Sequence, residues 1–313
     1  MRALRKNVAI SIDGGGIKGI VATRALAILE AYLQQPLHQV VRLTSGTSTG
    51  AIIAAGLAAG LTGQEMYALY TSMGAKVFAP SWRTRFWPLA RFKYPLAPLE
   101  SALRSALGDL TMSELWHKSG GCDLVITAFD VVENRTRFFK PWKEEYARLP
   151  LATAVLASCA VPTYFPVVAG RLVDGGVGSY GNPCYLAAFE LQEVLRWRPA
   201  ETTLLSLGTG RAPAMLKDGD AEHFWPWDWI GPALGAFAQS ADDQQVHLVD
   251  TIYDQLDFRR FQVDLRTPVA MDDPTQVKML TDYGDELGRK ILADEVEQPL
   301  SFRTLPRPAP TGD

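Results

Sequence analysis

The feature that most limits how this 313-residue chain folds is a short apolar run ending in three consecutive glycines. Residues 8–12 read VAISI, and Asp13-Gly-Gly-Gly follows at once. So short and β-branched a run predicts a buried strand. Residues 20–34 then repeat Ala, Leu and Ile at helical spacing, which predicts a helix directly after the glycine turn.

The same alternation of strand and helix continues along the chain, and it predicts an α/β fold. The expected fold has three layers, α/β/α, with a central, mostly parallel sheet covered on both faces. We expect one domain over residues 1–297 and a flexible, proline-rich tail over 298–313. The further predicted strands are 40–44, 124–130 and 204–208, and the further predicted helices are 49–59, 183–195 and 274–292.

Composition and charge exclude several classes of protein. The net charge of -3 gives no reason to expect a nucleic acid polymer as partner. The three cysteines are widely spaced and form no metal or disulfide pattern, which favours buried thiols in a reducing compartment. The longest apolar run has 11 residues, AIIAAGLAAGL, too few to cross a bilayer, so we expect a cytoplasmic protein.

A serine with the surroundings of a nucleophile follows the second predicted strand. Gly46, Ser48 and Gly50 form the pattern G-x-S-x-G between a strand and a helix. A turn this tight needs glycines on both sides, and it presents the hydroxyl beside a helix N-terminus, whose free N–H groups stabilise an oxyanion. The alternative is a small-residue loop in which Ser48 only caps the helix.

The first glycine turn has two interpretations. Gly14, Gly16 and Gly19 satisfy G-x-G-x-x-G, a dinucleotide-binding pattern, but the acid expected after the second strand is absent and Glu30 lies within a predicted helix. The second interpretation is an oxyanion hole formed by the unobstructed amides of residues 14–16. Lys18 opposes the helix dipole, so it is a candidate anion contact, or simply a tolerated solvated lysine.

The serine needs a base, and the best candidate is an aspartate. Asp174 ends a short apolar strand and is followed by Gly175 and Gly176, which allow close approach to the carboxylate. Partial burial would raise the pKa of this group and make it a stronger base. A hairpin turn explains Asp-Gly equally well on its own. None of the four histidines lies in a glycine-framed turn.

Taken together, DGGGIKG, GTSTG and DGG, in this order, resemble the patatin-like phospholipases. The stretches ASCAVPTYFP at 157–166, LLSLGTG at 204–210 and MDDPTQVKMLTDYG at 271–284 also resemble that family. The resemblance implies a patatin-like fold and a lipid acyl hydrolase with a Ser–Asp dyad and no histidine. Carried over by position, it makes Ser48 the nucleophile and Asp174 the base, and it assigns the oxyanion hole to Gly14, Gly15 and Gly16.

The expected reaction is acyl transfer without cofactor or metal. Ser48 attacks an ester carbonyl of a membrane lipid while Asp174 takes its proton, and water then releases the fatty acid. Two alternatives stay open. One is a Ser-His-Asp carboxylesterase of the α/β-hydrolase type completed by His223 or His247, and the other is a lipid- or nucleotide-binding module with a vestigial site.

Two aromatic segments interrupt the alternation of strands and helices. Residues 80–98 combine Trp, Phe, Pro and four cations, and residues 223–232 read HFWPWDWIGP. Tryptophan favours the boundary between water and membrane, so we expect peripheral membrane association and interpret 80–98 as a lid or membrane-docking insertion. The alternative is an ordinary surface subdomain with inward aromatics. Bacterial proteins similar to this chain include ones switched on by a partner or a nucleotide signal, so an unidentified activator is also expected.

Overall fold

One mixed sheet forms the centre of the molecule in the computed structural model, which describes residues 1–87, 89–118, 122–214 and 216–297. The strand order is β4-β3-β2-β1-β6-β7, and β5 pairs with β3. β4 and β5 run antiparallel to β3, and the remaining pairs are parallel. The strands are β1 Asn7–Ile12, β2 Val41–Gly46, β3 Asp123–Asp130, β4 Arg135–Phe139, β5 Leu172–Asp174, β6 Thr202–Leu207 and β7 Asp257–Phe261.

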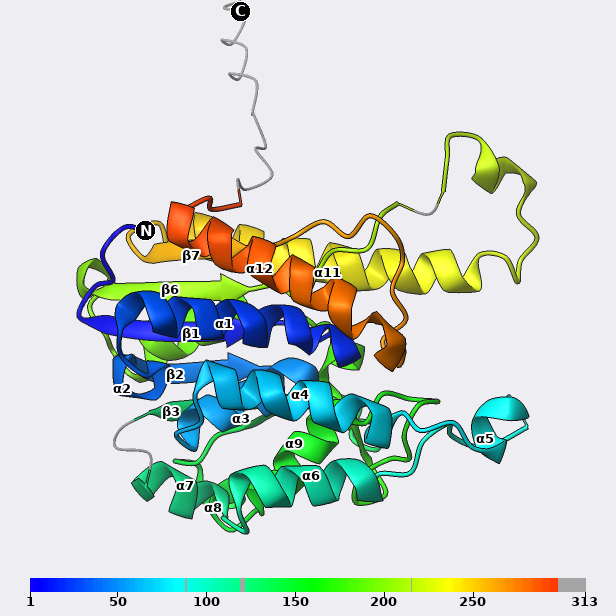
Figure 1. Ribbon diagram of the computed structural model, residues 1–313, viewed down its shortest axis with the longest axis horizontal. Helices are drawn as coiled ribbons and strands as arrows, with labels where there is room; N and C mark the ends of the chain where they lie inside the picture. The colour runs from blue at the N-terminus through cyan, green and yellow to red at the C-terminus, as the bar shows by residue number, and fades with distance from the viewer. Residues whose placement is uncertain (88, 119–121, 215, 298–313) are drawn as a thin grey trace, which may run out of the picture.

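Helices cover both faces of this sheet (Figure 1), so the predicted α/β/α fold with a mostly parallel sheet is confirmed. None of the helices within the described ranges is both long and apolar enough to cross a bilayer. The predicted flexible tail, 298–313, lies outside the described residues. The helices are α1 Gly19–Leu33, α2 Leu37–Val40, α3 Thr49–Ala58, α4 Gly63–Val77, α5 Trp82–Arg85, α6 Ala97–Leu107, α7 Met112–Lys118, α8 Glu144–Ala147, α9 Leu151–Cys159, α10 Cys184–Phe189, α11 Ile230–Ile252 and α12 Val277–Ala293.

The helix predicted over 183–195 is a different structure. α10 ends at Phe189 and a π-helical turn, Glu190–Val194, follows, in which the amide of Leu195 donates to the carbonyl of Glu190 at 2.8 Å. The buried carboxylate of Glu190 pairs with Lys140 from the loop after β4. Because Lys140 lies far from Glu190 in the sequence, the pattern of residues around Glu190 does not indicate this ion pair.

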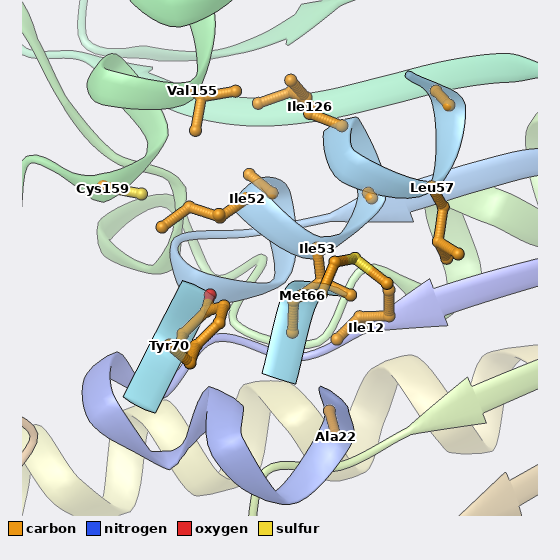
Figure 2. Close-up of a cluster of buried hydrophobic side chains, with 14 of the residues drawn as sticks. Ile12, Ala22, Ile52, Ile53, Leu57, Met66, Tyr70, Ile126, Val155 and Cys159 are labelled. Carbon is orange, nitrogen blue, oxygen red and sulfur yellow. The ribbon is translucent and has the colours of Figure 1, made fainter. Parts of the chain in front are cut away.

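The two faces of β1 explain why the sheet is covered on both sides. Ile10 and Ile12 belong to the larger core, which also includes residues of α1, α3, α4 and α12. Ala9, on the opposite face, packs in a smaller core with residues of α10 and α11. Figure 2 shows part of the larger core, where Ile12 from β1 lies near Ile53 from α3. A strand buried on both faces reads as a continuous apolar run, as residues 8–12 do.

The sheet brings the three glycine motifs together at the carboxyl ends of its parallel strands. β1 and β2 are parallel neighbours, so the glycine loop after β1 and the serine turn after β2 leave the sheet at the same end. β5 runs antiparallel to β3, with Asp174 opposite Ala128 near the carboxyl end of β3. Segments that are far apart in the sequence therefore converge beyond the carboxyl ends of the parallel strands, where open α/β sheets usually bind their ligands.

Candidate active site

The serine turn is a tight and strained connection between β2 and α3. Ser48 has φ 55° and ψ -124°, a backbone conformation that a non-glycine residue rarely adopts. A Cβ on Gly46 would lie 2.1 Å from the carbonyl oxygen of Gly50, and one on Gly50 would lie 2.1 Å from that of Ile12. Only glycine fits at either position, so the G-x-S-x-G spacing follows directly from the closeness of the backbones.

The end of α9 holds this turn in place. The amide of Ser48 donates to Oγ of Ser158 at 2.9 Å, and the thiol of Cys159 donates to the carbonyl of Ser48 at 3.2 Å. Ala160 follows, and its carbonyl accepts from the amide of Asp174 at 3.0 Å. One short segment thus fixes the backbones of both Ser48 and Asp174.

The carboxyl group of Asp174 is buried beside Ser48. Its Oδ1 accepts from the amide of Gly176 at 2.8 Å, whereas its Oδ2 has no hydrogen-bond partner among the described residues. Burial raises the pKa of Asp174 to about 6, while the Ser48 hydroxyl and the Gly176 amide act in the opposite direction. The Ser48 hydroxyl is therefore close enough to lower the pKa of the carboxyl group, without a short, well-aligned hydrogen bond between the two side chains.

The amides of the glycine loop are not equivalent. The amide of Gly14 donates to the carbonyl of Gly181 at 2.9 Å and is therefore not free for a substrate. The amides of Gly15 and Gly16 donate to no acceptor within the part of the chain that the structure describes. Gly16 has φ 61°, and a Cβ there would lie 2.4 Å from the carbonyl oxygen of Met271. The loop beside Ser48 therefore has two amide donors that no acceptor in the described ranges occupies.

The other motif glycines allow close packing. A Cβ on Gly19 would lie 2.3 Å from Oγ1 of Thr49, and one on Gly175 would lie 2.0 Å from Oγ1 of Thr127. Gly176 has more room, since its nearest neighbour would be Oδ1 of Asp174 at 3.1 Å. The first two glycines bring the helices and loops of the site against each other, and Gly176 mainly presents its amide to the carboxylate.

Lys18 lies at the base of the glycine loop. Its ammonium donates to the carbonyl of Gly210 at 3.3 Å. Burial lowers the pKa of Lys18, and the nearby carboxylates of Asp13 and Asp242 counteract this effect. A lysine near a helix N-terminus is stabilised by negative charge, and Asp13 and Asp242 supply that charge here. An anion contact at Lys18 stays a prediction.

A buried ion pair at Asp13, immediately before the glycine loop, was not predicted from the sequence. Arg260 on β7 donates to both oxygens of Asp13, at 2.8 and 2.5 Å, and also to Oγ of Ser206 at 2.9 Å. Burial raises the pKa of Asp13, although Arg260 opposes that rise. The acid immediately before the glycines was the available signal, but nothing local identifies its partner 247 positions later.

An apolar pocket leads away from Ser48 between α3, α4 and α9. Figure 2 shows Ile52, Tyr70 and Cys159, one from each of these helices, and all three line the pocket. The described residues that line the pocket include no histidine, and His223 and His247, the candidates for a histidine-completed triad, are both exposed. The pocket is lined by Gly16, Ile17, Ser48, Thr49, Ile52, Tyr70, Met73, Gly74, Val77, Phe78, Leu99, Cys159, Val161, Tyr164, Phe165 and Met271.

The supporting stretches quoted in the sequence analysis pack around this site. Ser158 and Ala160 belong to 157–166, and Met271, whose carbonyl accepts from the amide of Ile17 at 2.9 Å, opens 271–284. Thr209 belongs to 204–210, and its hydroxyl donates to the carbonyl of Gly14 at 2.6 Å. The role of these stretches was not predictable from the sequence, because each acts through contacts with another part of the chain.

Comparison with known proteins gives a consistent result. Residues 10–188 match the family model described as patatin-like phospholipase. A cGAMP-activated phospholipase of Pseudomonas aeruginosa is 28% identical over 96% of this chain and 93% of that protein. An intracellular phospholipase A2 of Caenorhabditis elegans is 30% identical over 66% of this chain and 20% of that protein. Among solved structures, VipD from Legionella pneumophila aligns with a TM-score of 0.48 and 13% identity, over 93% of this chain and 67% of that one.

Proposed function

Because the chain belongs to the patatin-like phospholipase family, we propose that it is a phospholipase A-type lipid acyl hydrolase that uses Ser48 as nucleophile and Asp174 as base. One arrangement supports this proposal: Ser48, in a strained turn, lines an apolar pocket and lies beside the buried carboxyl group of Asp174. An enzyme that cleaves long-chain esters needs all three features.

In the first step, Oγ of Ser48 attacks the ester carbonyl carbon and its proton passes to Asp174. The bond to the alcohol then breaks, the alcohol leaves with that proton, and an acyl-enzyme remains. In the second step, water attacks the acyl-enzyme, loses a proton to Asp174, and releases the fatty acid as Ser48 regains its hydrogen. A base with a pKa of about 6 is ionised at neutral pH and still binds a proton readily.

The negative oxygen of each tetrahedral intermediate needs hydrogen-bond donors. The amides of Gly15 and Gly16 are the loop donors without an acceptor in the described part of the chain, so we assign the oxyanion hole to them. The amide of Gly14 has a different role, since its bond to Gly181 ties the glycine loop to the segment that follows Asp174.

The apolar pocket is suited to the acyl chain of the substrate. Each methylene that leaves water for such surroundings contributes roughly 0.8 kcal/mol. Ser48 and Gly16 line the pocket together with the apolar side chains of Ile52, Val77 and Leu99. These three side chains offer an acyl chain an apolar surface. A long fatty acyl ester therefore fits better than a small polar ester.

Regulation by a nucleotide signal is part of the proposal. The Pseudomonas aeruginosa relative is named as cGAMP-activated and is similar over nearly the whole of both chains. We propose that this chain also has an activator of the cyclic dinucleotide class. Adding cGAMP to the protein should raise both its unfolding temperature and its activity on vesicles, whereas an unchanged activity would contradict this part of the proposal.

The test of the chemistry uses mixed phospholipid vesicles and a fluorophosphonate probe. Ser48→Ala should lose both fatty acid release and covalent labelling, and Asp174→Asn should lose release. Ser45→Ala is the matched control. Like Ser48, Ser45 is a buried serine, but it lies on β2 and its hydroxyl has no partner among the described residues. Fatty acid release by Asp174→Asn at the wild-type rate would contradict the dyad, and labelling of Ser48→Ala would place the nucleophile elsewhere.

A further inference from the structure

The first half of α11 is an uncharged and largely exposed helix. Residues 230–241 read IGPALGAFAQSA, and every residue from 234 to 240 is exposed. The side chains of Leu234 and Phe237 are 66% and 75% exposed. A helix that is apolar on all sides is normally surrounded by protein or lipid. The exposed apolar surface here marks an interaction site.

Three tryptophans lead into this helix. Trp225, Trp227 and Trp229 are 64%, 64% and 47% exposed, and the rings of the first two stack with their centroids 5.5 Å apart. Tryptophan concentrates at the boundary between water and the bilayer interior. We call residues 225–241 the α11 tip.

The α11 tip lies on the same side of the molecule as the candidate active site. In Figure 1, the first half of α11 and the short helix α5 both extend past the end of the sheet at which β1 and β2 finish. The glycine loop and Ser48 follow those two strands. A flat surface that meets both projections would therefore face the site.

Residues 81–93, which we call the α5 segment, supply positive charge on this side. They contain four cations and no acid, and Arg85 and Arg91 are exposed with no ion pair among the described residues. Trp82 and Phe86 beside them are 59% and 54% exposed. Position 88 lies outside the described residues. Exposed guanidinium groups among exposed aromatics suit a surface that carries lipid phosphates.

The acids of the α11 tip and its surroundings lie outside its helical part. Asp228 precedes the helix and accepts from the amide of Trp225 at 2.9 Å, Asp220 accepts from the amide of Lys217 at 2.8 Å, and Asp242 follows the last residue of the tip. Within residues 229–241 there is no charge of either sign. The apolar helix and the cationic segment are therefore separate, complementary parts of one surface.

The base of the α5 segment contacts the wall of the pocket. The amide of Lys93 donates to the carbonyl of Thr163 at 2.9 Å, and that of Tyr94 donates to the carbonyl of Tyr164 at 2.8 Å. The rings of Phe78 and Tyr94 meet edge to face with centroids 5.3 Å apart. Phe78 and Tyr164 line the pocket, so a lipid held at the α5 segment is close to the path toward Ser48.

We propose that the α11 tip inserts into an anionic phospholipid bilayer while Arg85 and Arg91 bind lipid phosphates. Twelve helical residues extend about 18 Å, less than the roughly 30 Å of a hydrocarbon core, so the helix enters one leaflet. A bilayer fits better than a second copy of the chain, because a protein interface covers one face of a helix, whereas all residues from 234 to 240, about two helical turns, are exposed here. This inference rests on the proposed function, since it gives the hydrolase access to its substrate.

Vesicle flotation in the inactive Ser48→Ala background tests the inference independently of hydrolysis. Leu234→Ser/Phe237→Ser should weaken binding to vesicles of phosphatidylcholine with 30% phosphatidylglycerol on the order of 100-fold. The control is Ile252→Ser/Val194→Ser, which removes two exposed apolar side chains at the far end of α11 and after α10 and should bind as the parent does. All four side chains are at least 40% exposed, so unfolding temperatures should not change.

A comparison of anionic and neutral vesicles tests the role of Arg85 and Arg91. Arg85→Gln/Arg91→Gln should lose most of the preference for anionic vesicles over pure phosphatidylcholine vesicles, and added salt should reproduce that loss in the parent. Equal binding of the parent to both kinds of vesicle would overturn the anionic part of the proposal.

Activity separates this inference from the proposed function. In the active protein, Leu234→Ser/Phe237→Ser should lose hydrolysis of vesicles but keep hydrolysis of a dispersed short-chain ester. With cGAMP present, flotation without any lipid hydrolysis would refute the proposed function and support the docking surface. Two outcomes would overturn the docking surface: unchanged flotation of the α11 tip variant, or a parent dimer that this variant converts to a monomer without any vesicle binding.

Discussion

Replacing the proposed base should stabilise the protein while it stops catalysis. Burial raises the pKa of Asp174 from the usual 3.8 to about 6, whereas in the unfolded chain this carboxyl group is exposed and keeps the usual value. Between these two pH values the folded state therefore binds more protons than the unfolded state. The free energy of unfolding falls as the pH rises through this window, and the whole loss is present above pH 6.

The size of the effect follows from the two pKa values. The interval from 3.8 to about 6 corresponds to about 3 kcal/mol of lost stability at neutral pH. Asp174→Asn carries no charge, and its carbonyl oxygen retains the bond from the Gly176 amide at 2.8 Å. We therefore expect the variant to gain up to about 3 kcal/mol at pH 8, which raises the unfolding temperature by up to about 5 °C in a protein of this size.

The assay is thermal unfolding at pH 8 and pH 5. The advantage of Asp174→Asn should shrink to about half at pH 5, because the wild-type carboxyl group is then largely protonated in the folded state. Ser48→Ala is the matched control: it is also expected to be inactive, but it keeps the buried carboxyl group and should not be stabilised. An unfolding temperature for Asp174→Asn that is lower than wild type, or raised equally at both pH values, would refute the reasoning.

The remaining predictions concern the pH profile and the loop that carries the oxyanion donors. If Asp174 is the base, kcat/KM on a dispersed ester should rise about tenfold per pH unit up to about pH 6 and then level off; a profile that is flat from pH 4 to 8 argues against it. Gly16→Ala places a Cβ 2.4 Å from the carbonyl oxygen of Met271 at a φ of 61°, so we expect a loss of about 2–3 kcal/mol in urea unfolding and at least about tenfold in vesicle hydrolysis. Arg260→Met leaves Asp13 buried without its partner and should lower the free energy of unfolding by about 3–5 kcal/mol, and adding Asp13→Asn should restore part of it. No restoration in the double variant would show that the ion pair is not what Arg260 contributes.

The predicted local elements of the fold are largely confirmed. Residues 8–12, 20–34 and 49–59 were predicted as strand, helix and helix, and they correspond to β1, α1 and α3 with ends that differ by one residue. Each is an apolar run or a helical repeat that begins or ends at glycines, so its state depends on residues close by in the sequence. The α11 helix was not predicted, because its first half has no polar face and therefore no amphipathic period.

The candidate site was predictable as three motifs but not as a working geometry. Local sequence shows that Ser48 follows a strand and that Asp174 precedes two glycines. It does not show that the amide of Gly14 donates to the carbonyl of Gly181, which is why the proposed oxyanion role falls to Gly15 and Gly16. Hydrogen bonds of this kind depend on which distant carbonyl the fold brings near, and periodicity contains no information about that.

By itself, the sequence determined the alternation of strands and helices, and with it the class of fold and the positions of the tight turns. These follow from backbone sterics and apolar spacing within about ten residues, which act before any distant contact forms. The tertiary structure alone decided that Arg260 supports Asp13, that the carboxyl group of Asp174 loses its water beside Ser48, and that the first half of α11 stays uncovered. Burial, pKa and exposure are properties of a position in the packed molecule, and only the folded arrangement of distant segments gives a side chain its surroundings.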